Sequence, residues 1–561
     1  MDGLLVPLWV RVKEKSRGAI GTGLLMTKQQ TEHEEYFTNY DPVLDQKQVR
    51  VVEHKKATKN VNPTLKINYD GKNFSDSRPI QSIALDPLRE GEKRARFLFV
   101  LMDQNDHLPK WTFGPAYLAS ALEAQDYEVR VFDGNALHWG VDRLAKFLSE
   151  EPFFDYIGFG FLSNYVHLLI EHVKVCRAVT PNSKVILGAN GFSPLPAFYL
   201  AKTGADYGVS GEAEVSLINL LNTLQAGKSP EHLPSISFRD GKDIFVSDLR
   251  EPVPEITSIA WPAYHHFHIE KYIHYRSHGY KKGSIGFHIL TSRGCPYRCN
   301  FCTRMEEGIR FRPFDDLFGE LEFLNDKYGV THFLHLDELF MTSKRHVKKF
   351  CEATIKAMDD GSLPRITWAT TGRFNIVDKE IAEVMAAAGC NEILFGLESG
   401  DTKVLELMNK KTSEELIGEG INATKNAGMS VQLPCMFGNI GETPETVQKT
   451  VEILIKYAPR EHRTVRPVAP YPGSPLYQYA LDQGLIRDHE EFFQMSRNPD
   501  QMTVNFTDMD DKLYYQTLFE ANKTLIESYY KEASRNEIEA YRRLYFDGDD
   551  SSFEPPDHQQ S

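Results

Sequence analysis

Short apolar runs alternate with helix-like segments along most of this 561-residue chain, and this alternation constrains the fold more than any other feature. Apolar strands separated by helices are typical of parallel sheets that helices cover on both faces. Five prolines between Pro230 and Pro262 divide the alternation into two series. The sequence therefore predicts an α/β protein with two successive domains of this kind.

The first series predicts a Rossmann-like domain over residues 91–250. Its strands are expected at 95–102, 128–134, 156–162, 184–189 and 205–211, and its helices at 113–125, 141–150, 165–179, 196–204 and 214–225. Such a domain binds its ligand beyond the carboxyl ends of the strands. Residues 1–90 are polar and rich in Lys and Asn, and we interpret them as an N-terminal extension with little core of its own.

After a linker at 251–280, the second series predicts a partial (β/α)6 barrel over residues 281–490. Its strands are expected at 286–292, 331–337, 365–372, 392–398, 429–438 and 463–469, with helices near 314–328, 343–358, 378–388, 413–427 and 444–457. Active sites of such barrels lie at the carboxyl ends of the strands. Residues 491–561 predict a helical C-terminal region that ends in an acidic tail.

Charge and hydropathy restrict the partners of the chain. The formal net charge of −14, from 64 basic and 78 acidic residues, argues against a general affinity for nucleic acid or anionic membranes. No apolar run approaches the roughly 18–20 residues that span a bilayer. The first residues, MDGLLVPLWVRV, lack the basic stretch and cleavage site of a targeting signal. We therefore expect a cytoplasmic protein without a membrane span.

Three of the seven cysteines lie within eight residues, in Cys295-Pro-Tyr-Arg-Cys299-Asn-Phe-Cys302, directly after the first predicted barrel strand. This clustering indicates a metal site in a reducing compartment. Three thiolates on one loop can hold three irons of a [4Fe-4S] cube and leave the fourth iron open to another ligand. A zinc site would need a fourth ligand, and His288 and His332 are conceivable donors outside any recognisable zinc pattern.

The spacing Cys-x3-Cys-x-aromatic-Cys after the first barrel strand resembles the radical SAM superfamily. In that family the open iron binds the amino and carboxylate groups of S-adenosylmethionine (SAM). One electron from the cluster then cleaves SAM to methionine and a 5′-deoxyadenosyl radical. The resemblance implies that Cys295, Cys299 and Cys302 bind the cluster and that Phe301 contacts the adenine of SAM.

Other positions that are similar to the family follow the later barrel strands. Glu398 or Ser399 either holds the ribose hydroxyls or the methionine amine of SAM, or caps the next helix. The turn Gly438-Asn-Ile-Gly441-Glu-Thr-Pro resembles the family's G-x-P-G-E-T turn, with Asn-Ile in place of Leu-Pro. Its glycines would let the backbone approach SAM. Arg373 either reaches the carboxylate of SAM or forms a salt bridge at the rim.

A parallel α/β domain directly before such a barrel resembles the cobalamin-binding class of the superfamily. Ser163 follows the third strand, where the corrin edge would lie, and Gly188 opens a loop that matches the family's G-G-x-H imperfectly. Gly211 and Glu212 begin Gly-Glu-Ala-Glu, close to the family's G-E-G-E. The resemblance implies cobalamin contacts at these four residues. Asp-x-His-x-x-Gly is missing, which implies no histidine of the protein on cobalt. The alternative is a domain that binds nothing and only packs on the barrel.

The linker carries three histidines in Trp-Pro-Ala-Tyr-His265-His266-Phe-His268. They either face cobalamin or substrate, or lie in a half-exposed connector. The sequence alone favours the connector.

The two domains together resemble the cobalamin-dependent radical SAM methyltransferases. The resemblance implies a [4Fe-4S] cluster, SAM and cobalamin as cofactors, and an electron donor such as flavodoxin or ferredoxin. It implies transfer of a methyl group from SAM, via methylcobalamin, to an unactivated carbon or phosphorus centre of a small-molecule or natural-product intermediate. The alternative is a cobalamin-dependent radical SAM oxidoreductase, cyclase or rearrangement enzyme without methyl transfer. A non-catalytic iron–sulfur regulator is the third possibility. No motif indicates the substrate or a catalytic side chain.

Overall fold

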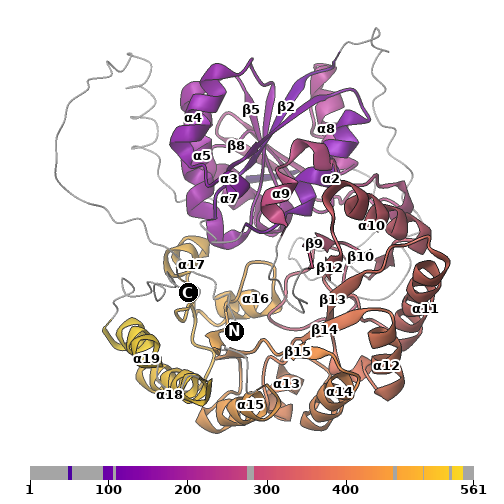
Figure 1. The fold of residues 1–561 in the computed structure, drawn as a ribbon. Helices are drawn as coiled ribbons and strands as arrows, with labels where there is room; N and C mark the ends of the chain where they lie inside the picture. Colours follow the sequence, from indigo (N-terminus) through magenta and orange to yellow (C-terminus); the bar gives the residue numbers. More distant parts are fainter. Residues whose placement is uncertain are drawn as a thin grey trace, which may run out of the picture.

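The computed structural model describes residues 49–52, 93–104, 109–273, 284–306, 308–458, 464–496, 498, 500–529 and 534–547. Figure 1 shows two α/β layers stacked on each other, with the N-terminal half above and the C-terminal half below. Most of the predicted N-terminal extension and the predicted acidic tail lie outside the described residues.

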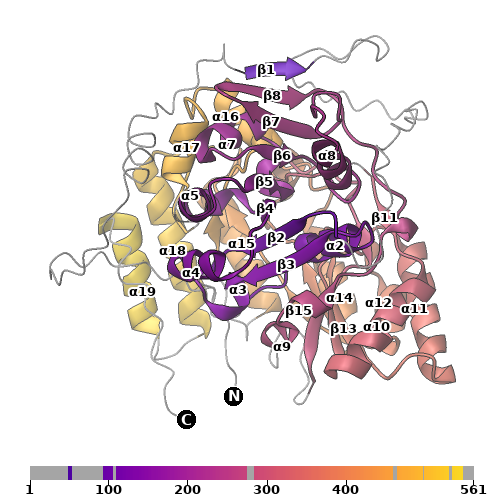
Figure 2. The same cartoon turned by 90° about the horizontal axis from the view of Figure 1, so that it is seen from above.

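Five parallel strands form the centre of the N-terminal sheet, in the spatial order β3-β2-β4-β5-β6 (Figure 2). They are β2 (Arg96–Leu101), β3 (Glu128–Asp133), β4 (Tyr156–Gly160), β5 (Lys184–Gly188) and β6 (Tyr207–Val209). In chain order this is the flavodoxin-like arrangement 2-1-3-4-5, which reverses direction between its first and third strands. That switch point lies between β2 and β4.

Helices cover both faces of this sheet, as the sequence predicts. One face packs on α2 (Phe113–Glu123) and α8 (Ser216–Gln225), and the other on α4 (Val141–Glu150), α5 (Val166–Val179) and α7 (Pro196–Thr203). Alternate residues of β2 point to opposite faces, because Phe97 and Phe99 belong to one buried cluster and Leu98 and Val100 to the other. A strand buried on both faces needs the continuous apolar run that the sequence has here.

Three further strands extend the sheet beyond β6. An antiparallel hairpin of β7 (Ile236–Asp240) and β8 (Asp243–Ser247) follows, and β1 (Val49–Val52) pairs in parallel with β8. Gly241 has φ 59°, so it supplies the left-handed conformation that the two-residue turn requires. The sequence analysis did not predict the hairpin, and the predicted N-terminal extension contributes an edge strand to the domain.

The C-terminal sheet has five parallel strands in the order β15-β14-β13-β12-β9. They are β9 (Gly286–Ile289), β12 (His332–His335), β13 (Thr367–Gly372), β14 (Cys390–Phe395) and β15 (Ser430–Gln432). The helices between them and after them are α10 (Phe314–Tyr328), α11 (Lys344–Asp360), α12 (Lys379–Ala387), α13 (Thr402–Leu407), α14 (Glu414–Asn426) and α15 (Pro444–Tyr457). Each predicted barrel helix is therefore present.

The last part of the predicted barrel differs from expectation. The predicted strand 429–438 divides into β15 and β16 (Met436–Phe437), and β16 pairs with β17 (Arg466–Pro467) in a separate sheet. Pro434 lies at the division, where proline has no N–H for a ladder hydrogen bond. The observed arrangement is thus a five-stranded sheet followed by a parallel pair.

The C-terminal region is helical, with α17 (His489–Met495), α18 (Asp511–Tyr529) and α19 (Ser534–Arg542). The hydroxyl of Tyr514 in α18 donates to the Phe437 carbonyl at 3.0 Å, and the Asn522 side chain bonds both backbone groups of Val465. Helix α18 thus satisfies the edge of the β16–β17 pair. None of the helices described is both long and apolar enough to cross a membrane.

Candidate functional site

The three clustered cysteines lie on one loop between two short antiparallel strands, β10 (Ser292–Arg293) and β11 (Arg310–Phe311), just past the carboxyl end of β9. Cys299 is buried, Cys295 is half-buried and Cys302 is exposed. Burial raises the pKa of the Cys302 thiol to about 11, and the other two cysteines add to this shift. The three thiols are therefore close enough to influence one another.

The spacing of the three sulfur atoms separates two kinds of metal site. Among the described residues, only Glu123, His265 and His266 bring three possible ligand atoms within 4.8 Å of one another, so the cysteine sulfurs are spread more widely. Two sulfurs on one zinc ion lie at most about 4.6 Å apart, because each Zn–S bond is about 2.3 Å. The loop therefore does not suit one zinc ion bound by all three thiolates, and it suits a polynuclear cluster better.

A buried carboxyl group fixes the start of the cysteine loop. Asp337, which follows β12, accepts hydrogen bonds from the backbone N–H groups of Thr291 and Ser292 at 2.7 and 3.1 Å. The Thr291 hydroxyl donates to the same carboxyl. Burial raises the pKa of Asp337 to about 6. The second barrel strand thus holds the end of the first one directly before Cys295.

A reciprocal pair of amides fixes the middle of the loop. The side chains of Asn300 and Asn439 donate to each other at 3.0 and 3.1 Å. The Asn300 backbone also bonds the Met408 carbonyl at 3.0 Å and the Leu476 N–H at 2.8 Å. Asn439 is fully buried and occupies the position where the family turn has Leu. The departure from the family pattern is therefore matched by a specific contact to the cysteine loop.

Three of the residues predicted to contact SAM meet around Lys410. The Lys410 ammonium lies 2.7 Å from a carboxylate oxygen of Glu398 and 5.8 Å from the centre of the Phe301 ring. The Arg373 side chain donates to the Lys410 carbonyl, and its guanidinium lies 3.7 Å from the centre of the Tyr297 ring. Glu398 has φ 60°, an uncommon backbone conformation for a residue other than glycine. No sequence motif pointed to Lys410.

The remaining barrel positions have local structural contacts. The Ser399 hydroxyl accepts from the Asp401 N–H at 3.3 Å, whereas Asp401 itself caps α13. Gly438 and Gly441 have φ 96° and 83°. A Cβ atom at Gly438 would lie 2.2 Å from the Tyr514 hydroxyl oxygen. These contacts explain the glycines without SAM, and the predicted approach to SAM stays a prediction.

Glu442 belongs to the same turn and is buried, and one of its carboxylate oxygens accepts from the N–H groups of Gly438 and Asn439 at 2.5 and 3.1 Å. Burial raises the pKa of Glu442 from 4.5 to about 8, and nearby Asp401 raises it further. The native protein therefore binds this proton more tightly than the unfolded chain does. The free energy of unfolding that this group contributes consequently falls as the pH rises from about 5 to 8.

We expect Glu442→Gln to remove this pH dependence, because the amide keeps an acceptor oxygen and cannot ionise. Between pH 5 and 8 the free energy of unfolding of the wild type should fall relative to the variant, by a few kcal/mol at most, since one pKa unit corresponds to about 1.4 kcal/mol. Urea unfolding of both proteins at the two pH values measures the difference. Identical pH dependence of the two proteins would contradict the prediction.

Two of the predicted cobalamin contacts lie at the carboxyl edge of the N-terminal sheet. Ser163 lies in the turn after β4, and Gly188 ends β5, where it pairs with Gly160. This is the edge that contains the switch point between β2 and β4, where ligands of such sheets bind. Leu162 follows β4 and Leu336 follows β12, and these two side chains are 50% and 48% exposed. Each sheet thus carries an exposed apolar side chain just beyond a strand end.

The other two predicted cobalamin contacts connect the two halves of the molecule. The Glu212 carboxylate forms ion pairs with Arg293 at 2.9 Å and with Arg310, and Glu214 lies 2.8 Å from Arg293. Both arginines belong to the hairpin that carries the cysteine loop. Gly211, just before, has φ 80°. In this structure Glu212 therefore positions the cysteine hairpin, a contact that the sequence analysis did not foresee.

Comparison with known proteins follows the same division of the chain. Residues 289–454 match the family model of the radical SAM superfamily. An uncharacterized methyltransferase of Pyrococcus horikoshii is 24% identical over 66% of this chain and 79% of its own. The cytidylyl-2-hydroxyethylphosphonate methyltransferase of Streptomyces wedmorensis is 26% identical over 69% and 82%. The anaerobic magnesium-protoporphyrin IX monomethyl ester cyclase of Cereibacter sphaeroides is 26% identical over 68% and 62%.

Two solved structures share the fold beyond the matched domain. The radical SAM methyltransferase TsrM of Kitasatospora setae, solved with cobalamin and a [4Fe-4S] cluster, has a TM-score of 0.59 and 21% identity, and covers 70% of this chain and 78% of its own. The cobalamin-dependent SAM radical enzyme OxsB, solved with aqua-cobalamin and SAM, has a TM-score of 0.60 and 16% identity over 81% and 71%. The predicted resemblance is confirmed: the chain carries a radical SAM domain, and its homologues are radical SAM enzymes that include named methyltransferases.

Proposed function

We propose that this protein is a cobalamin-dependent radical SAM methyltransferase that acts on a small-molecule or natural-product intermediate. One observation carries the proposal: the three-cysteine loop lies at the carboxyl edge of the barrel sheet, and Glu212 ties it to the carboxyl edge of a flavodoxin-like sheet. Ligands bind at these edges in both kinds of fold. The arrangement can therefore hold two cofactors close to one substrate.

The residues present fit the cofactors. Three cysteines on one loop, too widely spaced for a single shared zinc ion, match the requirement of a [4Fe-4S] cluster with one open iron. We assign SAM to the barrel positions Phe301, Arg373, Glu398, Ser399, Gly438 and Gly441, and cobalamin to Ser163, Gly188, Gly211 and Glu212. When bound, the cluster supplies the electron that cleaves SAM, and cobalamin carries the methyl group.

The side chains of this protein would orient and shield these groups. Asp337 and the Asn300–Asn439 pair hold the cysteine loop from two sides, so its geometry does not depend on the loop alone. Lys410 places a positive charge beside Glu398 and the Phe301 ring, which suits a site for the negatively charged end of an amino acid. Apolar Leu162 and Leu336 suit a region from which water is excluded, as radical chemistry requires.

The same two-part fold also supports a second reaction. One relative is named as a cyclase and not as a methyltransferase. A cobalamin-dependent cyclase, oxidoreductase or rearrangement enzyme would need the same cluster and the same SAM contacts. The two proposals differ in one step, because only a methyltransferase removes the methyl group from SAM and leaves S-adenosylhomocysteine.

The first experiment is therefore anaerobic reconstitution of the full chain with iron, sulfide and hydroxocobalamin, followed by incubation with SAM and a strong reductant. We expect one cobalamin per chain and the formation of both S-adenosylhomocysteine and 5′-deoxyadenosine. Formation of 5′-deoxyadenosine alone would favour the second reaction. A cluster-loaded protein that binds no cobalamin would overturn both cobalamin proposals.

We further propose the division into an N-terminal extension at 1–90, a cobalamin domain at 91–250, a linker at 251–280, a barrel at 281–490 and a helical region at 491–561. The strand β1 modifies this division, because it joins the sheet of the second unit. A flavodoxin or ferredoxin as electron donor, and a cytoplasmic location, belong to the same proposal.

A further inference from the structure

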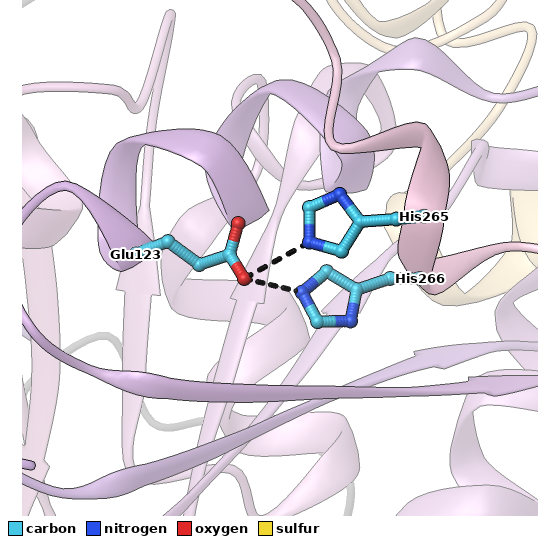
Figure 3. Close-up of side chains that lie close together, drawn as sticks. All are labelled: Glu123, His265 and His266. Carbon is cyan, nitrogen blue, oxygen red and sulfur yellow. Dashed lines mark hydrogen bonds and ion pairs between the residues drawn. The ribbon is translucent and has the colours of Figure 1, made fainter.

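A second group of metal-binding side chains lies in the linker, outside the cysteine loop. Glu123 ends α2, and His265 and His266 belong to a single 3-10 turn, η4 (Tyr264–His266). Figure 3 shows the two imidazole rings side by side, with one nitrogen of each directed at the same carboxylate oxygen. The Nε2 atoms of His265 and His266 lie 3.1 and 2.8 Å from Oε1 of Glu123. The three donors therefore already converge on one point.

This donor set is that of a zinc-type ion. Two imidazole nitrogens and one carboxylate oxygen bind Zn2+ at about 2.0–2.2 Å, which places the donors roughly 3.3 Å apart around a tetrahedral ion. The observed separations need only small side-chain adjustments to reach that value. The His265 side chain is 56% exposed, so an ion can enter from solvent and keep a water ligand. We propose that Glu123, His265 and His266 bind a divalent metal ion of the zinc class.

The charges around the group are compatible with a bound cation. Burial lowers the pKa of His266, so its imidazole is held in the neutral form that binds metals. Arg130 is the nearby cation that acts on His266, and its guanidinium is paired with Glu151 at 3.0 Å. His268, two residues further on, lies 3.6 Å from Glu270 and is not part of the converging group.

The position of the site indicates a structural role. The linker already bonds α2 through the Ser120 hydroxyl to the Trp261 carbonyl and through the Ala263 N–H to the Ala116 carbonyl. Tyr264, in the same turn as the two histidines, donates from its hydroxyl to Glu320 of α10. A metal ion on Glu123 would fasten this turn to the N-terminal domain, while Tyr264 holds it to the barrel. The ion would thus brace the two halves of the protein.

The test measures zinc on the full-length, cluster-loaded protein, in which iron occupies the cysteines. After chelator treatment, the protein is incubated with zinc sulfate and passed through a desalting column, and its metal content is determined by mass spectrometry. We expect one zinc per wild-type chain and a loss of this zinc in Glu123→Gln and in His265→Ala. His268→Ala is the matched control and should retain it. Circular dichroism verifies that all variants are folded.

A competition titration with a chromophoric zinc chelator gives a second readout that does not depend on enzyme activity. The wild type and His268→Ala should compete equally well, and the two site variants should compete less. Equal zinc content in the wild type, Glu123→Gln and His265→Ala would overturn the proposal, as would a wild type without zinc. Because the readout is zinc and not SAM chemistry, failure of the proposed enzyme function would leave this result interpretable.

Discussion

Cys299→Ala is expected to abolish cluster assembly and, with it, all cleavage of SAM. Cys299 is the most buried of the three clustered cysteines and lies between the other two in the loop. Removal of its thiolate leaves one more iron without a protein ligand, so the cube loses the single open position that the proposed chemistry needs. The visible absorbance of the reconstituted protein should fall to that of the apoprotein. Formation of 5′-deoxyadenosine should fall below detection.

Cys351→Ala is the matched control for this substitution. Cys351 is buried in α11 and belongs to the aliphatic and aromatic core, so its loss should lower stability by about 1 kcal/mol and leave iron content unchanged. Iron and sulfide analysis of the two variants after identical reconstitution makes the comparison. A Cys299→Ala protein that retains four irons and cleaves SAM would show that this thiol is not a cluster ligand.

The cysteine site was predictable because its ligands are local in sequence. The spacing of Cys295, Cys299 and Cys302 places all three on one loop, whatever the rest of the chain does. The strands of the N-terminal domain were predictable for a similar reason, because a run such as residues 97–100 buries side chains on both faces. Both predictions rest on patterns shorter than ten residues.

The partners of the cysteine loop were not predictable, because they come from distant parts of the chain. Asn439 pairs with Asn300 across 139 positions, and Lys410 reaches Glu398 only because the backbone turns at Glu398. The Glu212 carboxylate faces Arg293 only after the two halves have packed. Single-sequence reasoning assigned Glu212 to cobalamin from a motif, and the ion pair gives that carboxylate a second role.

Two differences in the fold also have local causes that carried a signal. Asp240-Gly241 lies between two apolar runs and is a typical two-residue hairpin turn, so the β7–β8 hairpin was visible in the sequence. Pro434 stands inside the predicted strand 429–438, where proline argues against a continuous central strand. In both places the proline and glycine positions deserved more weight than the apolar composition.

Glu320→Ala is expected to be one of the most destabilising single substitutions in the described structure. Glu320 is fully buried in α10, where one carboxylate oxygen pairs with Arg312 and the other accepts from the Tyr264 hydroxyl. Its removal leaves a buried guanidinium without one of its two carboxylates and a buried hydroxyl without an acceptor. Loss of one partner from a buried ion pair costs about 3–5 kcal/mol. The damage would fall where the linker, the barrel and the cysteine hairpin meet.

Asp316→Asn supplies the matched control, because Asp316 pairs with the same arginine at 2.6 Å but its side chain is 40% exposed. An exposed pair contributes at most about 1 kcal/mol, so this variant should remain close to the wild type. Urea unfolding followed by tryptophan fluorescence reports on this region directly, since Trp111 stacks on Tyr264 with ring centres 5.8 Å apart. Equal losses in Glu320→Ala and Asp316→Asn would mean that burial does not set the strength of the Arg312 pairs. A much larger loss in Glu320→Ala would identify this carboxyl group as the one that holds the linker between the two sheets.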